Sequence, residues 1–225
     1  MPPWLSRWPW PQGPALLGID LDPPQACLLS CARAGPSWRI EQCAGLDLPP
    51  ESLEAGRILE FEALAASLKQ LVGAAGGGRR IALALPRSAA WHQELAVPAG
   101  LRPWAWRGWV RRQAEQLAGV PADTLAIEVT LQPGPPLCAQ LSVCPRELVE
   151  DWQGLAEAAD LDLVLLDDRS RVVRLAQQAL GMVPESPAAN LDPLDLVDWR
   201  PGLDRPVQTA GFLAALGLAL RAWHS

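Results

Sequence analysis

The sequence predicts an α/β protein in which a small α+β unit interrupts a larger layered domain. Short apolar runs with the length of buried strands stand at 16–21, 81–85 and 161–166. Apolar residues with helical spacing fill 60–72, between the first two of these runs. The segment 88–145 is different, because its strands alternate apolar and polar residues as half-buried strands do. A chain of 225 residues is long enough for this arrangement.

The composition is that of a folded protein without a broad basic surface. Hydrophobic residues make up 49% of the chain and charged residues 20%, so enough apolar surface can be buried to fold it. Twenty-five acidic against nineteen basic side chains give a net charge of −6. Since nucleic-acid binding depends on cationic side chains, this balance argues against a dedicated nucleic-acid protein.

The cysteines and the apolar segments indicate a reducing compartment and no membrane span. The five cysteines form no CxxC pair and are accompanied by only two histidines, so we expect buried or half-buried thiols and no zinc site. In the N-terminal arm, 1–14, prolines interrupt the tryptophans, and the apolar region of an export signal is missing. The most apolar run, 210–220, is too short to span a bilayer and predicts a buried helix.

The order of elements in the first third of the chain is informative. The first apolar run is followed by strands at 26–33 and 38–48, which the turn signal Gly35-Pro36 separates, so we expect a three-stranded meander. The helix and the second apolar run come next. Strand, strand, strand, helix, strand is the opening of a ribonuclease-H-like layer, the building block of actin-like folds.

The inserted unit is predicted to contain one strand, one helix and one hairpin. A strand at 92–97 precedes Pro103, which suits the first turn of a helix that runs to 118. Two alternating strands, 125–131 and 137–143, are joined by a turn rich in proline and glycine. A unit of about sixty residues is within the range of a small domain.

After this unit the layer resumes and ends on an apolar helix. A helix, a strand and a second helix, which Asp168 or Ser170 can cap, are followed by a surface connection and a buried helix. These five segments are 147–159, 161–166, 171–180, 184–206 and 207–223.

Four segments, taken in this order, resemble the PilM family of type IV pilus assembly and its relative FtsA. They are 17–20 (LGID), 80–86 (RIALALP) with 92–98 (HQELAVP), 155–167 with 171–174, and 215–221 (ALGLALR). The resemblance implies an actin-like domain I of α/β class. In it, subdomain 1A occupies 15–87 and 146–225, and an SHS2-type α+β subdomain 1C is inserted at 88–145.

The resemblance also implies a partner and a place in the cell. The partner would be the N-terminal tail of a PilN-like inner-membrane protein, docked in a groove between 1A and 1C. Other pilus assembly components would join it, at the cytoplasmic face of the inner membrane. The candidate walls of the groove are Trp106, Arg107, Trp109 and Arg111 on the 1C helix and Arg171 and Arg174 on a 1A helix. At least two of the tryptophans 104, 106 and 109 are expected to pack in the core.

The chain departs from nucleotide-binding members of this family at two places. Such members follow the first strand with Gly and Ser, whose N–H and hydroxyl groups face phosphate. Here Asp22, Pro23 and Pro24 occupy that turn, and proline has no N–H to donate. Between 180 and 207 there is also too little chain for a second domain. We therefore expect no cofactor, no enzymatic activity and a vestigial phosphate loop, formed by Gly18, Asp20, Asp22, Pro23 and Pro24.

Other chemistry has weaker support. Asp20 could hold a metal, although a strand-end aspartate more often caps a turn. With Asp167 or Asp168 it could form a ribonuclease-H-like nuclease site, but such enzymes need more carboxylates and a basic substrate face. No serine or cysteine partner is signalled for His92 or His224, so a hydrolase triad is not expected.

The sequence predicts a non-catalytic scaffold, and three alternatives remain open. These are a residual actin-like ATP-binding protein, a cytoplasmic GspL-like component of type II secretion and, more remotely, the nuclease. Residues 190–200 also echo the Asn-Leu-Leu-Pro segment that PilN-type partners offer, so an internal mimic that fills the partner groove is a further hypothesis.

Overall fold

The computed structural model describes most of the chain beyond its N-terminal arm. The described residues are 16–35, 37–132, 134, 136–182, 191–203, 205 and 209–221, without the side chains of Arg87, Thr209 and Ala210. The predicted arm at 1–14, with its tryptophans, and His224 lie outside them.

A six-stranded mixed sheet forms the centre of the molecule. Its order is β10-β6-β1-β2-β3-β11. β1, β2 and β3 form the predicted antiparallel meander, while β6 and β10 run parallel to β1. β11 runs parallel to β3 at the opposite edge, in a segment predicted to be only a surface connection. The bounds are β1 (Leu17–Asp22), β2 (Gln25–Ala34), β3 (Ser37–Asp47), β6 (Arg80–Leu85), β10 (Asp162–Asp168) and β11 (Asp198–Trp199).

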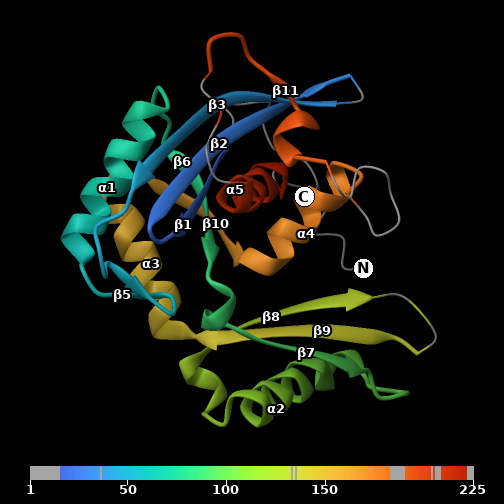
Figure 1. Cartoon of the computed structure of the whole chain (residues 1–225). Coiled ribbons are helices and arrows are strands. Elements are labelled where there is room, and N and C mark those ends of the chain that lie inside the picture. The colour runs from blue at the N-terminus through green and yellow to red at the C-terminus, as the bar shows by residue number, and fades with distance from the viewer. Residues whose placement is uncertain are drawn as a thin grey trace.

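Helices cover both faces of this sheet (Figure 1). α1 (Phe61–Ala74) and α3 (Arg146–Ala158) pack on one face, where Leu68 and Trp152 are fully buried. α4 (Arg169–Ala179) and α5 (Thr209–Arg221) pack on the other. The buried terminal helix is therefore confirmed, with Phe212 and Leu216 at 0% exposure. All five cysteines are free and buried or half-buried, as predicted.

A short hairpin that the sequence did not reveal lies beside α3. It consists of β4 (Leu53–Glu54) and β5 (Arg57–Ile58). The indole N–H of Trp152 donates to the carbonyl of Gly56 in its turn, over 2.9 Å. Because a buried indole needs a hydrogen-bond acceptor, this contact fixes the hairpin against α3.

The inserted unit has its own three-stranded antiparallel sheet, of order β7-β9-β8. Its strands are β7 (Trp91–Ala96), β8 (Leu125–Gln132) and β9 (Cys138–Pro145). α2 (Trp106–Ala118), preceded by a 3₁₀ turn from Pro103, packs on one face of this sheet. Trp109 and Val110 of the helix meet Leu141 of β9 in that core.

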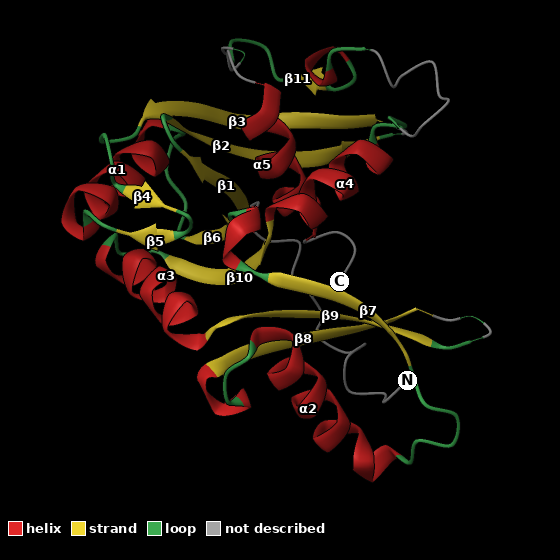
Figure 2. Ribbon diagram, turned by 60° about the horizontal axis from the view of Figure 1, so that its bottom comes forward, coloured by secondary structure: helices red, strands yellow, loops and turns green. Residues whose placement is uncertain are grey.

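Strand alternation leaves the second face of this small sheet to side chains such as His92, Glu128 and Ser142. That face is turned toward β10 and α4 of the large layer, while α2 lies on the far side (Figure 2). The junction between the two sheets is therefore lined by the small sheet and not by its helix.

The segment 191–203 is part of the core of the large layer. Leu194 and Val197 are buried there with Phe212 of α5, and the Trp199 and Phe212 ring centroids are 5.9 Å apart. This position is at the β3 edge of the sheet, away from the junction with the small sheet. The described residues 191–200 therefore do not occupy the junction between the two sheets.

Candidate functional site

Asp20, at the end of β1, is buried against an arginine. Its carboxylate is 1% exposed and accepts from the Arg169 guanidinium through Nε (3.1 Å to each oxygen) and Nη2 (2.9 Å). The same Nη2 lies 2.8 Å from the Asp22 carboxylate. Asp20 is therefore ion-paired with the Arg169 side chain, and the expectation that it caps a turn is wrong.

The topology explains this pairing. β1, β6 and β10 are parallel, so their carboxyl ends share one edge of the sheet. α4 begins directly after β10, and Asp168 caps it by accepting from the Arg171 N–H over 3.0 Å. Arg169 is therefore carried by the first turn of α4 to the end of β1. The signal in the sequence is a basic residue directly after the third parallel strand.

Burial sets the charge state of Asp20. Loss of water contact raises the pKa of its carboxyl to about 6, and the Arg169 charge opposes this rise without cancelling it. Since burial penalises the charged form, the ionised carboxylate is tolerated at neutral pH because the guanidinium is in contact with it.

The other residues that were predicted to form a vestigial phosphate loop have structural contacts of their own. Pro23 and Pro24 form the two-residue turn between β1 and β2, joined by a cis peptide bond. The Pro24 carbonyl accepts from the Leu48 N–H, over 2.8 Å. A Cβ on Gly18 would lie 2.1 Å from the Ala215 carbonyl oxygen, so this glycine admits α5. The close packing of α5 therefore explains why residue 18 is a glycine.

Two further carboxylates at this edge of the sheet also have cationic partners. Asp167 lies 2.8 Å from Arg221 Nε and 3.7 Å from Arg171 Nη1, and burial raises the pKa of its carboxyl although both arginines oppose the rise. Asp168 lies 3.2 Å from His92 Nε2. Each acid that a nuclease would use is held by arginine or histidine, so a metal ion would have to displace these groups.

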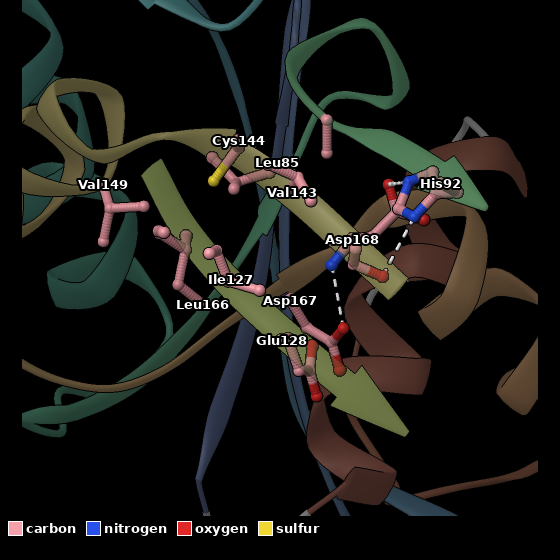
Figure 3. A pocket seen from close by; sticks show the side chains of 13 residues that line it. Leu85, His92, Ile127, Glu128, Val143, Cys144, Val149, Leu166, Asp167 and Asp168 are labelled. Carbon is pink, nitrogen blue, oxygen red and sulfur yellow. Dashed lines mark hydrogen bonds and ion pairs between the residues drawn. The ribbon is translucent and has the colours of Figure 1, made fainter. Parts of the chain in front are cut away.

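A cavity of about 210 Å³ lies at the junction between the two sheets. Its interior is apolar, with side chains from β6, α3 and β10 facing those of the small sheet (Figure 3). Its rim is polar and carries three acids. The apolar residues are Leu85, Ala90, Ala126, Ile127, Val143, Cys144, Val149 and Leu166, and the polar ones are His92, Glu128, Ser142, Asp167 and Asp168.

Polar contacts across this rim tie the two units together. His92 Nδ1 lies 3.0 Å from Ser142 Oγ, and its Nε2 contacts Asp168 across the junction (Figure 3). Arg171 of α4 pairs with Glu128 of β8 over 2.8 Å. The order serine, histidine, aspartate is that of a hydrolase triad, which we did not expect. Ser142, however, sits on β9, which pairs on both sides, so the neighbouring N–H groups serve the ladder and not an oxyanion hole.

The predicted partner residues are divided by the structure. Arg171 stands at the rim through Glu128, whereas Arg174, farther along α4, is exposed and does not line the cavity. Trp106, Arg107, Trp109 and Arg111 are all on α2, behind the small sheet, so helix α2 is not a wall of this cavity. Trp109 is buried and Trp106 packs against the same core, as expected for two of the three tryptophans.

Of the residues that line the cavity, His92, Asp167 and Asp168 were considered from the sequence, but Glu128, Ser142 and the apolar side chains were not. His92 was on a correctly placed strand, and Glu128 alternates with apolar neighbours on β8. Alternation showed that these side chains share one face, but not that this face meets the large layer.

The sheet order, with a small sheet inserted after β6, defines an actin-like fold of mixed α/β architecture. The family described as "Type IV pilus assembly protein PilM" matches residues 18–192. Because the match covers most of this chain, the chain belongs to the PilM family of type IV pilus assembly proteins. The resemblance expected from the sequence is confirmed.

Two solved structures are similar to this chain to different degrees. One, described as "PilM-PilN type IV pilus biogenesis complex", superposes with a TM-score of 0.71 at 16% identity, over 93% of this chain and 98% of that one. The other is the cytoplasmic domain of EpsL, an inner-membrane component of the type II secretion system of Vibrio cholerae. It has a TM-score of 0.46 and 12% identity, over 77% of this chain and 61% of that one.

Among the described residues, no helix is both long and apolar enough to cross a membrane.

Proposed function

We propose that this protein is a non-catalytic scaffold that binds the N-terminal tail of a PilN-like inner-membrane protein in the cavity between its two units. The large layer is then subdomain 1A and the inserted unit an SHS2-type subdomain 1C. The observation that carries the proposal is the cavity itself, because it is apolar inside, polar at its rim and placed where two rigid units meet.

The chemistry of the cavity fits a short peptide. Leu166 and Val149 offer an apolar pocket for an aliphatic side chain, and His92 and Ser142 at its rim offer polar groups to the peptide beside it. Such a tail would hold the scaffold at the cytoplasmic face of the inner membrane, where further pilus assembly components could join it. The likeness to the PilM–PilN complex supports the choice of partner.

The edge of the sheet where actin-like proteins bind nucleotide supports the non-catalytic part of the proposal. Arg169 occupies the place of a metal at Asp20, and Pro23 and Pro24 provide no N–H groups for phosphate. Asp22 adds a carboxylate that repels a phosphate.

Filling the cavity is expected to weaken tail binding. Ala126→Phe places a ring among Leu85, Val149 and Leu166, where the tail side chain would sit. We expect the dissociation constant of a fluorescent PilN-like tail peptide, measured by anisotropy, to rise at least roughly tenfold, which is about 1.4 kcal/mol.

Ala66→Phe is the matched control, because Ala66 is exposed on α1, away from the cavity. Thermal melting of both variants checks that they are folded. Equal peptide affinity in the two variants would show that the tail binds elsewhere.

Nucleotide is expected to leave the stability of the chain unchanged. A ligand present at a hundred times its dissociation constant stabilises the native state by about 2.7 kcal/mol, which for a domain of this size is a rise in Tm of roughly 5–10 °C. We expect no such rise when Mg-ATP is added in a thermal-shift experiment. A rise of that size would establish the alternative, an actin-like ATP-binding protein.

A further inference from the structure

The outer face of α2 is basic and exposed. The helix buries one stripe, in which Trp109, Val110 and Ala114 pack against the small sheet. The opposite stripe and the 3₁₀ turn before it leave five side chains in solvent, with Trp104 at 77% exposure. These five are Arg102, Trp104, Arg107, Arg111 and Arg112, which we call the α2 basic face.

The charge of this face is opposite to that of the whole protein. Four arginines lie within eleven residues of a chain whose net charge is −6. The acid nearest in sequence, Glu115, accepts from the Ala122 N–H over 3.0 Å and so is held toward the turn after the helix. Within the described part of the chain, none of the four arginines is in an ion pair, while other arginines such as Arg79 and Arg205 are.

These arginines are not needed to form the small domain. Its core is closed by the apolar stripe of α2, including Trp106 and Trp109, whose ring centroids are 5.2 Å apart. Three guanidinium groups on α2, with that of Arg102 just before it, repel each other and so oppose the folded state. A binding role for the face accounts for them.

We propose that the α2 basic face docks on an anionic lipid surface. Guanidinium groups bind lipid phosphates, and an exposed indole inserts at the level of the headgroups, where tryptophan is enriched in membrane proteins. A helix with one apolar face packed on its own protein and a basic, Trp-bearing outer face lies on such a surface and does not cross it.

The position of α2 makes this contact possible without closing the cavity. In both views α2 is the outermost element of the small domain, beyond its sheet (Figures 1 and 2). The residues that line the cavity project from the opposite face of that sheet, as His92 and Ser142 do. A membrane on the outer side therefore leaves the cavity free for a peptide.

An anionic membrane accounts for the face better than nucleic acid or an acidic protein. The acids elsewhere on the chain would repel a long polyanion, whereas a flat bilayer meets only the outermost helix. Trp104 lies in the 3₁₀ turn that precedes α2, between Arg102 and Arg107 in the sequence, and offers an apolar ring to the interface.

Vesicle flotation tests the proposal with the full chain. We expect the protein to float with vesicles of equimolar phosphatidylcholine and phosphatidylglycerol and to stay behind with pure phosphatidylcholine. Each basic residue near an anionic surface strengthens binding roughly fivefold, so Arg107→Gln with Arg111→Gln should weaken it roughly 25-fold. Trp104→Ala should weaken it too, and salt should release the protein.

The matched control is Arg57→Gln with Arg200→Gln, which removes the same charge from two exposed positions far from α2. We expect it to float like the native chain. Equal loss in both double variants, or equal binding to the two kinds of vesicle, would overturn the proposal. Capture by immobilised polyglutamate without flotation would overturn it as well and assign the face to an acidic protein. The tail-peptide affinity of Arg107→Gln with Arg111→Gln, measured without lipid, should be unchanged, which separates this proposal from the peptide site.

Discussion

Gly217→Ala is expected to unfold the large layer under conditions in which the native chain is folded. Gly217 lies in α5 where this helix crosses α4, and a Cβ there would lie 1.9 Å from the carbonyl oxygen of Val172 and 2.5 Å from its carbonyl carbon. Backbone atoms of a packed helix cannot yield as a side chain does, so the two helices would have to separate. Overpacking of a core costs about 1–3 kcal/mol and sometimes more, and we expect a loss of at least about 3 kcal/mol.

Urea unfolding followed by circular dichroism measures this loss, and Gly73→Ala is its control. Gly73 lies in α1, and a Cβ there would meet no atom within 4 Å. Alanine is the better helix former, so this variant should gain up to about 1 kcal/mol. If both variants have the same free energy of unfolding, α4 and α5 do not pack as closely as described.

Two glycines together explain why α5 can be buried. Gly18 admits the helix on the sheet side and Gly217 on the α4 side, and both contacts are with backbone. The sequence of 215–221 predicts an apolar helix. The role of Gly217, however, can be recognised only from the packing of α5 against α4 in the structure.

Much of the fold could be predicted because its strands and helices carry local signals. The apolar run Leu17–Leu21 and the amphipathic helix around Trp152 are recognised from spacing alone. β4, β5 and β11 have two residues each, too few for any periodicity. These short strands form through contacts with longer elements, as β11 does by pairing with β3 and the β4–β5 turn does by its hydrogen bond from Trp152 of α3.

The candidate site could be predicted only in part, because it depends on how two units face each other. Helical spacing places Trp109 on one side of α2, but the sequence does not say which face of the small sheet the helix covers. The same holds for Asp20, whose partner Arg169 is far away in sequence and is brought near by three parallel strands.

Arg169→Met is expected to destabilise the protein in a way that depends on pH. The variant leaves Asp20 buried without its counter-charge, and breaking a buried pair in this way costs about 3–5 kcal/mol. The folded-state pKa of Asp20, about 6, lies above the ordinary aspartate pKa of 3.8, so the proton is bound more tightly in the folded state. The stability that this proton contributes is full below the unfolded pKa and is lost as pH rises through the folded pKa. Without Arg169 nothing opposes burial, so the pKa rises further and the penalty is largest at high pH.

The measurement is the free energy of unfolding of Arg169→Met and of Asp20→Asn, from about pH 4 to about pH 8. Arg169→Met should fall increasingly below the native chain as pH rises. Asp20→Asn should match the native chain at low pH and exceed it by about 1–3 kcal/mol at high pH, because it has no buried carboxyl to ionise. Asp20→Asn with Arg169→Met should recover most of the loss. If the difference in free energy of unfolding between Arg169→Met and the native chain were instead the same at all pH values, Arg169 would not stabilise the ionised form of Asp20. Since an arginine that stabilises Asp20 does so without any metal or nucleotide, a pH-dependent loss of stability in Arg169→Met is the result expected of a structural contact.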